Sequence, residues 1–230
     1  MQKKMGRDNE HLNQNEIAAI LNGSLVLKKE RACFRHWKSC PECRVRLSEY
    51  FTGAGTFAPV PTAEHVRLYN IASNPAFHVA CSDAAVVAAA FSLKALHNTL
   101  PCAAAAGTHP DEDPFSTELV SRLTNYFTFG TPFGRIPVHL ISVKSAFMNQ
   151  VLFWTWLIPP GETVSYGAIA SWLGRPGAAR AVGQALHRNP VPLIIPCHRV
   201  LGKDGQLMGF GAGIGLKRHL LQLEGHSLKS

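Results

Sequence analysis

The chain has 230 residues, of which 46% are hydrophobic and 17% are charged, and its formal net charge at pH 7 is +8. This composition can bury a core and excludes a disordered chain, and the longest apolar run, near residues 79–93, is broken by Asp83, so we expect no membrane span. Residues 139–230 hold nine Lys and Arg against three Asp and Glu, which favours a polyanionic partner.

The cysteine distribution indicates a reducing compartment. Six cysteines occur at positions 33, 40, 43, 81, 102 and 197, mostly toward the amino terminus and not as a spread disulfide framework. No apolar signal core follows the first four residues. We therefore expect a cytoplasmic protein, with Cys81 and Cys102 as core and loop residues that have no role in chemistry. A monomer is the default expectation.

Residues 1–52 are predicted to form a small helical module. Ile17, Ile20 and Leu21 mark one helix, which Asn22-Gly23 stops. A charged second helix starts near Lys28 and runs into the sequence His36-Trp37-Lys38-Ser39-Cys40-Pro41-Glu42-Cys43.

The spacing His-x3-Cys-x2-Cys in this module predicts three zinc ligands, His36, Cys40 and Cys43. His11 is our choice for the fourth ligand and Cys33 is the alternative; a reduced, metal-free helical hairpin would carry the same pattern. The segment resembles the zinc-binding anti-sigma-factor module over about forty residues, which implies a structural zinc and a protein partner. It lacks the effector region that would make it a regulator by itself.

A glycine- and proline-rich stretch predicts a linker at residues 53–64, so that the chain from Ala63 onward should fold without the module. An α/β domain is expected at residues 65–140. Its predicted elements are strands at 65–71 and 77–81 with a turn at 73–75, a strand or buried helix at 85–91, a loop at 101–114 and a helix at 115–127.

Residues 141–230 are predicted to form a helical domain. A buried helix spans 145–157, and Thr163 or Ser165 caps a second helix that stops at Gly174. With a third helix at 178–187, the last two have the helix-turn-helix pattern. By itself such a pair more often serves packing than DNA binding.

Cys197 is the candidate nucleophile. It follows a short apolar run between prolines, too short for anything but a buried strand or a turn, and His198 and Arg199 come next. A neighbouring base or cation favours the thiolate, which is the nucleophilic form. The alternative is a buried structural cysteine at the end of a strand.

The sequence Ile195-Pro196-Cys197-His198-Arg199-Val200 resembles the active-site signature of the alkyltransferases that repair O6-alkylguanine in DNA. Further matches follow in the family's order at residues 160–167, 178–183, 189–190, 217 and 220–225. The resemblance implies an α/β plus α fold, with a ribonuclease H-like α/β domain before a helix-turn-helix alkyltransferase domain. It also implies minor-groove binding to double-stranded DNA, base flipping and irreversible alkyl transfer without a cofactor. O4-methylthymine is a second candidate substrate.

The same resemblance implies the role of each site residue. Cys197 accepts the alkyl group, His198 draws the thiol proton through a water molecule, and Glu224 orients His198. Tyr166 donates to the departing guanine, and Arg180 fills the gap left by the flipped base. The remaining candidates are the hinge residue Asn189 and the substrate- or DNA-binding residues Arg199, Val200, Phe210 and Gly211. Phe210 stands where many members have tyrosine, which leaves the range of alkyl groups open.

Two other function classes remain open. The chain could be a non-catalytic sensor of alkyl lesions, although such proteins lack the acceptor cysteine that is present here as Cys197. It could also be a zinc-dependent regulator that binds a protein through residues 1–52.

Overall fold

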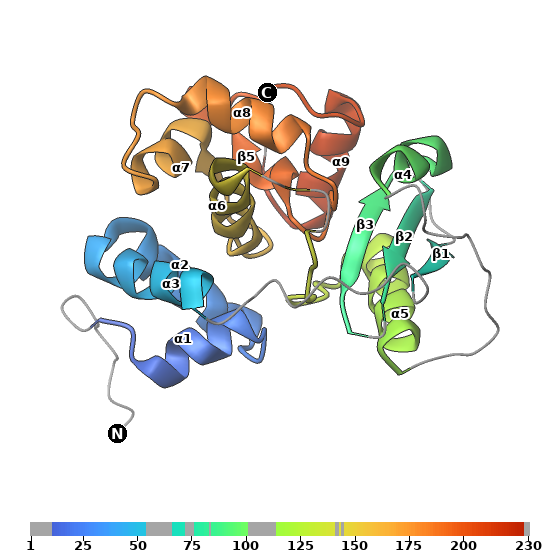
Figure 1. Cartoon of the computed structure of the whole chain (residues 1–230), viewed down its shortest axis with the longest axis horizontal. Coiled ribbons are helices and arrows are strands. Elements are labelled where there is room, and N and C mark those ends of the chain that lie inside the picture. The colour runs from blue at the N-terminus through green and yellow to red at the C-terminus, as the bar shows by residue number, and fades with distance from the viewer. Residues whose placement is uncertain are drawn as a thin grey trace.

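The computed structural model describes residues 11–53, 66–71, 76–82, 84–100, 114–140, 143 and 145–227. Along the chain come three amino-terminal helices, a three-stranded sheet with two helices, and a mainly helical carboxy-terminal part (Figure 1). The fold is therefore mixed α/β with a helical amino-terminal region. No helix within these residues is long and apolar enough to cross a membrane.

The amino-terminal region has one helix more than the sequence pattern predicts. α1 (Gln14–Leu21) begins at Asn13, whose side chain forms a capping box with Glu16, and it ends at Asn22 as expected. α2 (Leu27–Ser39) and α3 (Pro41–Gly53) replace the single predicted second helix. Proline suits the first position of a helix but disfavours helical backbone in the residue before it, so Cys40 lies at the break with extended backbone.

The sheet is antiparallel, in the order β1 (Arg67–Ile71), β2 (Phe77–Cys81), β3 (Val86–Ala90). Every residue of β3 is buried. The sequence was compatible with either a strand or a buried helix at residues 85–91, and the segment forms a strand. α5 (Pro114–Phe129) confirms the predicted helix and packs against β1. α4 (Leu93–Thr99) was not predicted. The expected turn at 73–75, the loop at 101–113 with Cys102, and linker residues 54–64 lie outside the described residues.

Four helices and a two-stranded sheet form the carboxy-terminal part. They are α6 (Ala146–Trp156), β4 (Val164–Ser165), α7 (Tyr166–Trp172), α8 (Ala179–His187), β5 (Val200–Leu201) and α9 (Ile214–Leu223). Ser165, not Thr163, caps α7, because its Oγ accepts a hydrogen bond of 3.0 Å from Ala168 N. β4 pairs in parallel with β5, which joins the start of α7 to the segment after Cys197.

β3 connects the three-stranded sheet to the candidate nucleophile segment. Val86 N donates to Pro137 O at 3.0 Å, and Ala89 N donates to Pro190 O at 2.9 Å. Pro190 belongs to the run that precedes Cys197. The sheet therefore supports the candidate site directly.

The amino-terminal helices pack against the carboxy-terminal part, below α6 and α7 in the view of Figure 1. Trp37 contacts Trp154 and Trp172, with ring centroids 5.4 and 5.2 Å apart. Arg135 is buried, donates to Ile20 O at 2.7 Å and pairs with Glu30 at 2.7 Å. These contacts argue against the independent module that the linker composition suggested.

Candidate functional site

Cys197 begins a short 3₁₀ turn, Cys197–Arg199, that follows a tight turn of the backbone at residues 192–195. Within that turn the backbone of Leu193 has a φ of 71°, a value that residues other than glycine rarely adopt, and the Leu193 side chain is fully buried. Such strain, of order 1–3 kcal/mol, persists only where the surroundings fix the backbone. The sequence predicted a buried strand or a turn for the apolar run before Cys197, and the structure has a turn.

Asn189 connects the turn to the sulfur atom. Its Nδ2 donates to Ile195 O at 2.9 Å and lies 3.3 Å from Cys197 Sγ, while its Oδ1 accepts from Val191 N at 3.0 Å. Burial raises the pKa of the Cys197 thiol, although the Asn189 hydrogen bond and the charge of Lys217 oppose this effect. The resting thiol is therefore protonated, in contrast to the ready thiolate that the adjacent His and Arg suggested.

His198 is fully buried against Glu224, with Nε2 3.0 Å from Oε1. Burial lowers the pKa of His198 despite the opposing effect of the carboxylate, so the ring is neutral near pH 7. Its Nδ1 is buried and has no hydrogen-bond partner within the described part of the chain. With the Nε2 hydrogen directed at Glu224, Nδ1 is free to accept a proton.

Arg199 binds the other side of the same carboxylate. Its Nε and Nη2 lie 2.9 and 2.7 Å from the two Glu224 oxygens, and its Nη1 donates to Ile158 O. Burial raises the pKa of Glu224, but the charge of Arg199 and the hydrogen bond from His198 hold it well below its usual 4.5. Arg199 is buried and fully engaged, which corrects the expectation that it contacts substrate or DNA.

The structure adds two residues whose roles sequence reasoning missed. Tyr126, on α5, donates its hydroxyl to Glu224 Oε1 at 3.0 Å, across 98 positions of sequence. Lys217 is fully buried on α9, and its Nζ donates to Val200 O at 2.6 Å and to Tyr166 OH at 3.4 Å. The only sequence signal for Lys217 was its place within the family motifs; Tyr126 had none.

Burial also sets the protonation of the pair formed by Tyr166 and Lys217. It raises the pKa of Tyr166 to about 12 and lowers that of Lys217 to about 8. Tyr166 therefore keeps its proton at neutral pH and can act as a donor.

Two cavities adjoin these residues. One, of about 650 Å³, is lined by Asn189, Cys197, Phe210 and Gly211, with β3 and α4 residues on its opposite side. The other, of about 760 Å³, is lined by residues that include Tyr166 and Arg180. Arg180 is exposed near the start of α8. Val200 is buried in β5 and lines neither cavity, so its predicted contact with substrate is not seen.

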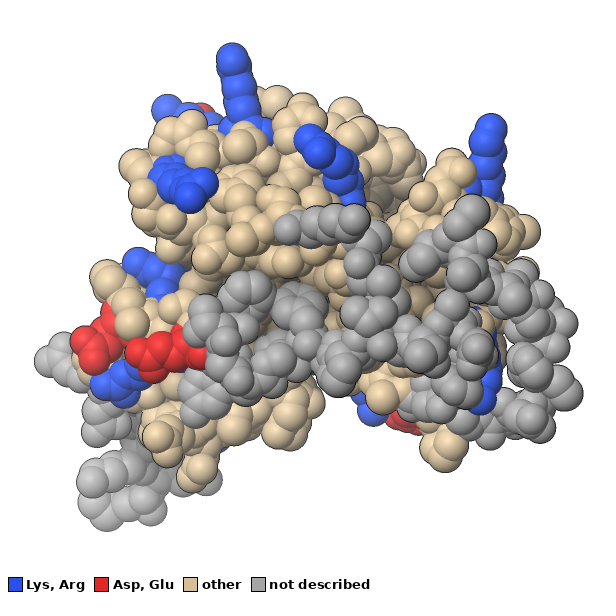
Figure 2. Space-filling model, viewed as in Figure 1, with Lys and Arg blue, Asp and Glu red and all other residues tan. Residues whose placement is uncertain are grey.

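Positively charged side chains prevail near α7 and α8, whereas the amino-terminal helices carry charges of both signs (Figure 2). In the view of Figure 2, Lys and Arg side chains project from the upper part, where Figure 1 draws α7 and α8, whereas the acidic side chains gather mainly near the amino-terminal helices. The face beside the second cavity therefore suits an anionic ligand.

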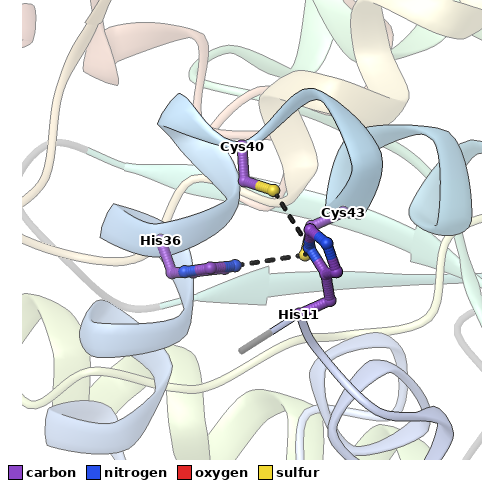
Figure 3. A group of neighbouring side chains, drawn as sticks. All are labelled: His11, His36, Cys40 and Cys43. Carbon is purple, nitrogen blue, oxygen red and sulfur yellow. Dashed lines mark hydrogen bonds between the residues drawn. The ribbon is translucent and has the colours of Figure 1, made fainter. Parts of the chain in front are cut away.

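His11, His36, Cys40 and Cys43 form a separate cluster, in which the four side chains point toward one another (Figure 3). Their ligand atoms lie within 4.8 Å of each other, with N–S distances of 3.1 Å from His36 to Cys43 and 3.4 Å from His11 to Cys40. Zinc bonds of about 2.0 Å to nitrogen and 2.3 Å to sulfur in a tetrahedron require N–S distances of about 3.5 Å. The donor set therefore fits zinc; Cys33, the alternative ligand, is not in the cluster.

Comparison with known proteins agrees with the site geometry. Residues 146–226 match the family model described as 6-O-methylguanine DNA methyltransferase, DNA binding domain. The methylated-DNA–protein-cysteine methyltransferase of Mycobacterium leprae is 45% identical over 122 residues, which are 53% of this chain and 72% of that protein. A crystal structure of Mycobacterium tuberculosis OGT in complex with DNA has a TM-score of 0.56 at 36% identity, covering 69% of this chain and 92% of that one. The chain belongs to the methylated-DNA–protein-cysteine methyltransferase family.

Proposed function

We propose that this chain repairs DNA by moving an alkyl group from O6 of guanine to the sulfur of Cys197. Family membership carries the reaction class, alkyl transfer to a cysteine of the protein. The observation that supports Cys197 as the acceptor is its position at the wall of a cavity. Asn189 Nδ2 lies against its sulfur, and the next residue in the chain, His198, is paired with Glu224. The reaction needs no cofactor.

The transfer breaks the bond between the alkyl carbon and O6 and forms a thioether at Cys197. Because burial keeps the thiol protonated, its proton passes to His198 Nδ1, through a water molecule, as the sulfur attacks. Glu224 stabilises the resulting imidazolium. The departing purine takes a proton from Tyr166, and since a thioether is not reversed by any of these groups, each chain acts once.

DNA binding is assigned to α7 and α8 as a helix-turn-helix. Arg180 borders the cavity that Tyr166 lines, so its planar guanidinium can stack in the gap left by a flipped base. The neighbouring residues Ala178, Ala179 and Ala181 are small and would permit close approach to a minor groove. We propose further that the three-stranded sheet and its helices form a ribonuclease H-like domain. The chain is proposed to act as a monomer and to accept O4-methylthymine as a second substrate.

Mass spectrometry after mixing with a methylated duplex tests the reaction. We expect at most one added methyl group per chain, on the peptide that contains Cys197. Cys197→Ala should abolish transfer and leave DNA binding largely intact. Sustained turnover, or binding of the lesion by the wild-type chain without transfer, would contradict the proposal; the second result would identify a lesion sensor.

We also infer that His11, His36, Cys40 and Cys43 bind one structural zinc ion. The N–S distances and the two-histidine, two-cysteine donor set support this assignment. Freshly reduced protein should contain about one zinc per chain, because a structural site of this kind holds a single ion. Cys40→Ser should lose it and Cys33→Ala should retain it; metal-free wild-type protein would refute the site.

A further inference from the structure

The segment at residues 158–163 lies between α2 and the carboxylate of Glu224. At one end Ile158 O accepts from Arg199, and Gly161 N lies 3.5 Å from Glu224 Oε2. At the other end the segment continues into β4 and then into Tyr166. Its position therefore affects both the carboxylate behind His198 and the proposed proton donor.

Three cations on α2 contact the outer side of this segment; Arg31, Arg35 and Lys38 are referred to below as the basic stripe. Their spacing of four and three residues places them on one face of the helix. Arg31 Nε donates to Pro160 O at 2.7 Å, and Lys38 Nζ donates to Thr163 O at 3.3 Å. Arg35 lies 3.5 Å from Glu162 but is 65% exposed, so this pair contributes little.

Gly161 shows how closely α2 and the site are packed. Its φ is 76°, and a side-chain carbon added there would collide with the Arg31 guanidinium and lie 3.1 Å from the carbonyl oxygen of Glu224. A single residue thus separates the amino-terminal region from the residue that holds His198 and Arg199. A displacement of Arg31 would therefore shift Gly161 relative to Glu224.

The metal-ligand cluster adjoins the carboxy-terminal end of the same helix, which contributes His36 directly. His36 stands between Arg35 and Lys38, and Cys40 follows the last residue of α2. We propose that α2 is a positioning element for alkyl transfer: Arg31 and Lys38 of the basic stripe fix residues 158–163 against Glu224, and zinc at the cluster fixes the carboxy-terminal end of the helix that carries the stripe. This inference rests on the proposed reaction and the proposed zinc site.

The kinetic test uses the double variant Arg31→Ala/Lys38→Ala in the full chain, with Lys28→Ala/Lys29→Ala as its control. The control residues are exposed on the same helix and have the same charge. Single-turnover transfer from a methylated duplex and from free O6-methylguanine should slow about tenfold in the stripe variant, since small misplacements of reacting groups cost this much or more. The end point of one methyl per chain should be kept, whereas mere loss of folded protein would lower the end point. Arg31→Lys should recover part of the rate that Arg31→Ala loses.

Hydrogen exchange supplies a readout that does not depend on transfer. Amides of residues 161–166 should exchange faster in the stripe variant and in zinc-free protein, and at the wild-type rate in the control. Faster exchange in a protein that never transfers methyl would refute the proposed function and leave the structural coupling intact. Unchanged exchange together with unchanged transfer rates in the stripe variant would overturn the inference.

Discussion

The indole ring of Trp37, in α2, packs against that of Trp154, in α6, with their centroids 5.4 Å apart. Trp37 is 1% exposed and Trp154 is 4% exposed, although the two residues belong to different parts of the chain. Fully burying a large apolar side chain contributes about 1.5–3 kcal/mol, so this contact is a substantial part of the folding free energy of an ordinary domain. The amino-terminal helices are therefore part of the alkyltransferase core.

Deletion of these helices tests that conclusion. A chain that begins at Ala63 should melt at lower temperature and give a lower end point of methyl transfer, because Trp154 becomes exposed and buried Arg135 loses its contacts with Glu30 and Ile20. Thermal unfolding and quantitative methyl transfer measure the two effects. Deletion of residues 1–10 alone, which keeps His11, is the control. Wild-type melting and a full end point in the shorter chain would restore the idea of an independent module.

The local parts of this fold could be predicted from sequence. Apolar spacing predicts the helices α5 and α6, the Pro-Gly pair before residue 178 predicts the start of α8, and the family resemblance groups Cys197, His198 and Glu224 in one site. The structure brings the last two together. The helix predictions are confirmed because apolar periodicity is carried by neighbouring residues, whereas the contact between His198 and Glu224, 26 positions apart, was expected only from the family resemblance.

Long-range pairings could not be predicted in this way. Arg135 and Glu30 lie 105 positions apart, and Tyr126 and Glu224 lie 98 apart, so no local pattern relates them. The predicted effect of Arg199 on the thiol was wrong, because a cation that is adjacent to a cysteine in sequence stabilises the thiolate only if the charge faces the sulfur. Here the guanidinium faces Glu224, and burial raises the pKa of Cys197. The composition that predicts a linker at residues 53–64 likewise carries no information about contacts between the elements on either side of it, such as that of Trp37 with Trp154.

Glu224 should control the acid end of the stability profile. Its folded-state pKa lies well below the usual 4.5, so in acid the unfolded chain binds more protons here than the folded chain does. The stability from this residue is thus fully present above about pH 5.5 and is lost as the pH falls through 4.5 toward the lowered value. We expect urea titrations to show the free energy of unfolding falling in that range.

Glu224→Gln provides the check on this assignment. It should flatten the acid slope and destabilise the chain by about 3–5 kcal/mol at neutral pH, because Arg199 stays buried without its charged partner. Glu118→Gln, in an exposed pair with Arg122, should change neither quantity appreciably. An unaltered acid slope in Glu224→Gln would show that other carboxylates set it.

Arg180 should matter only when the lesion lies in a duplex. Since a free alkylguanine leaves no gap to fill, Arg180→Ala should slow repair of duplex DNA strongly and leave reaction with the free base nearly unchanged. Rate constants on the two substrates measure the difference. Arg122→Ala removes the same charge from α5 and should affect neither. Equal losses on both substrates in Arg180→Ala would rule out a gap-filling role.

Tyr166 should behave in the opposite way, because its proposed partner is the purine itself. Burial raises its pKa to about 12, so the hydroxyl is protonated across the neutral range, and Lys217 Nζ lies 3.4 Å from the phenol oxygen. Tyr166→Phe keeps the ring and removes only the donor, and loss of one donor to a developing negative charge costs about 10²–10³ in rate. We expect that loss on duplex and free base alike, with DNA affinity unchanged in a binding titration. A loss confined to the duplex would instead make Tyr166 a DNA contact, and an unchanged rate on both substrates would require another proton donor for the leaving guanine.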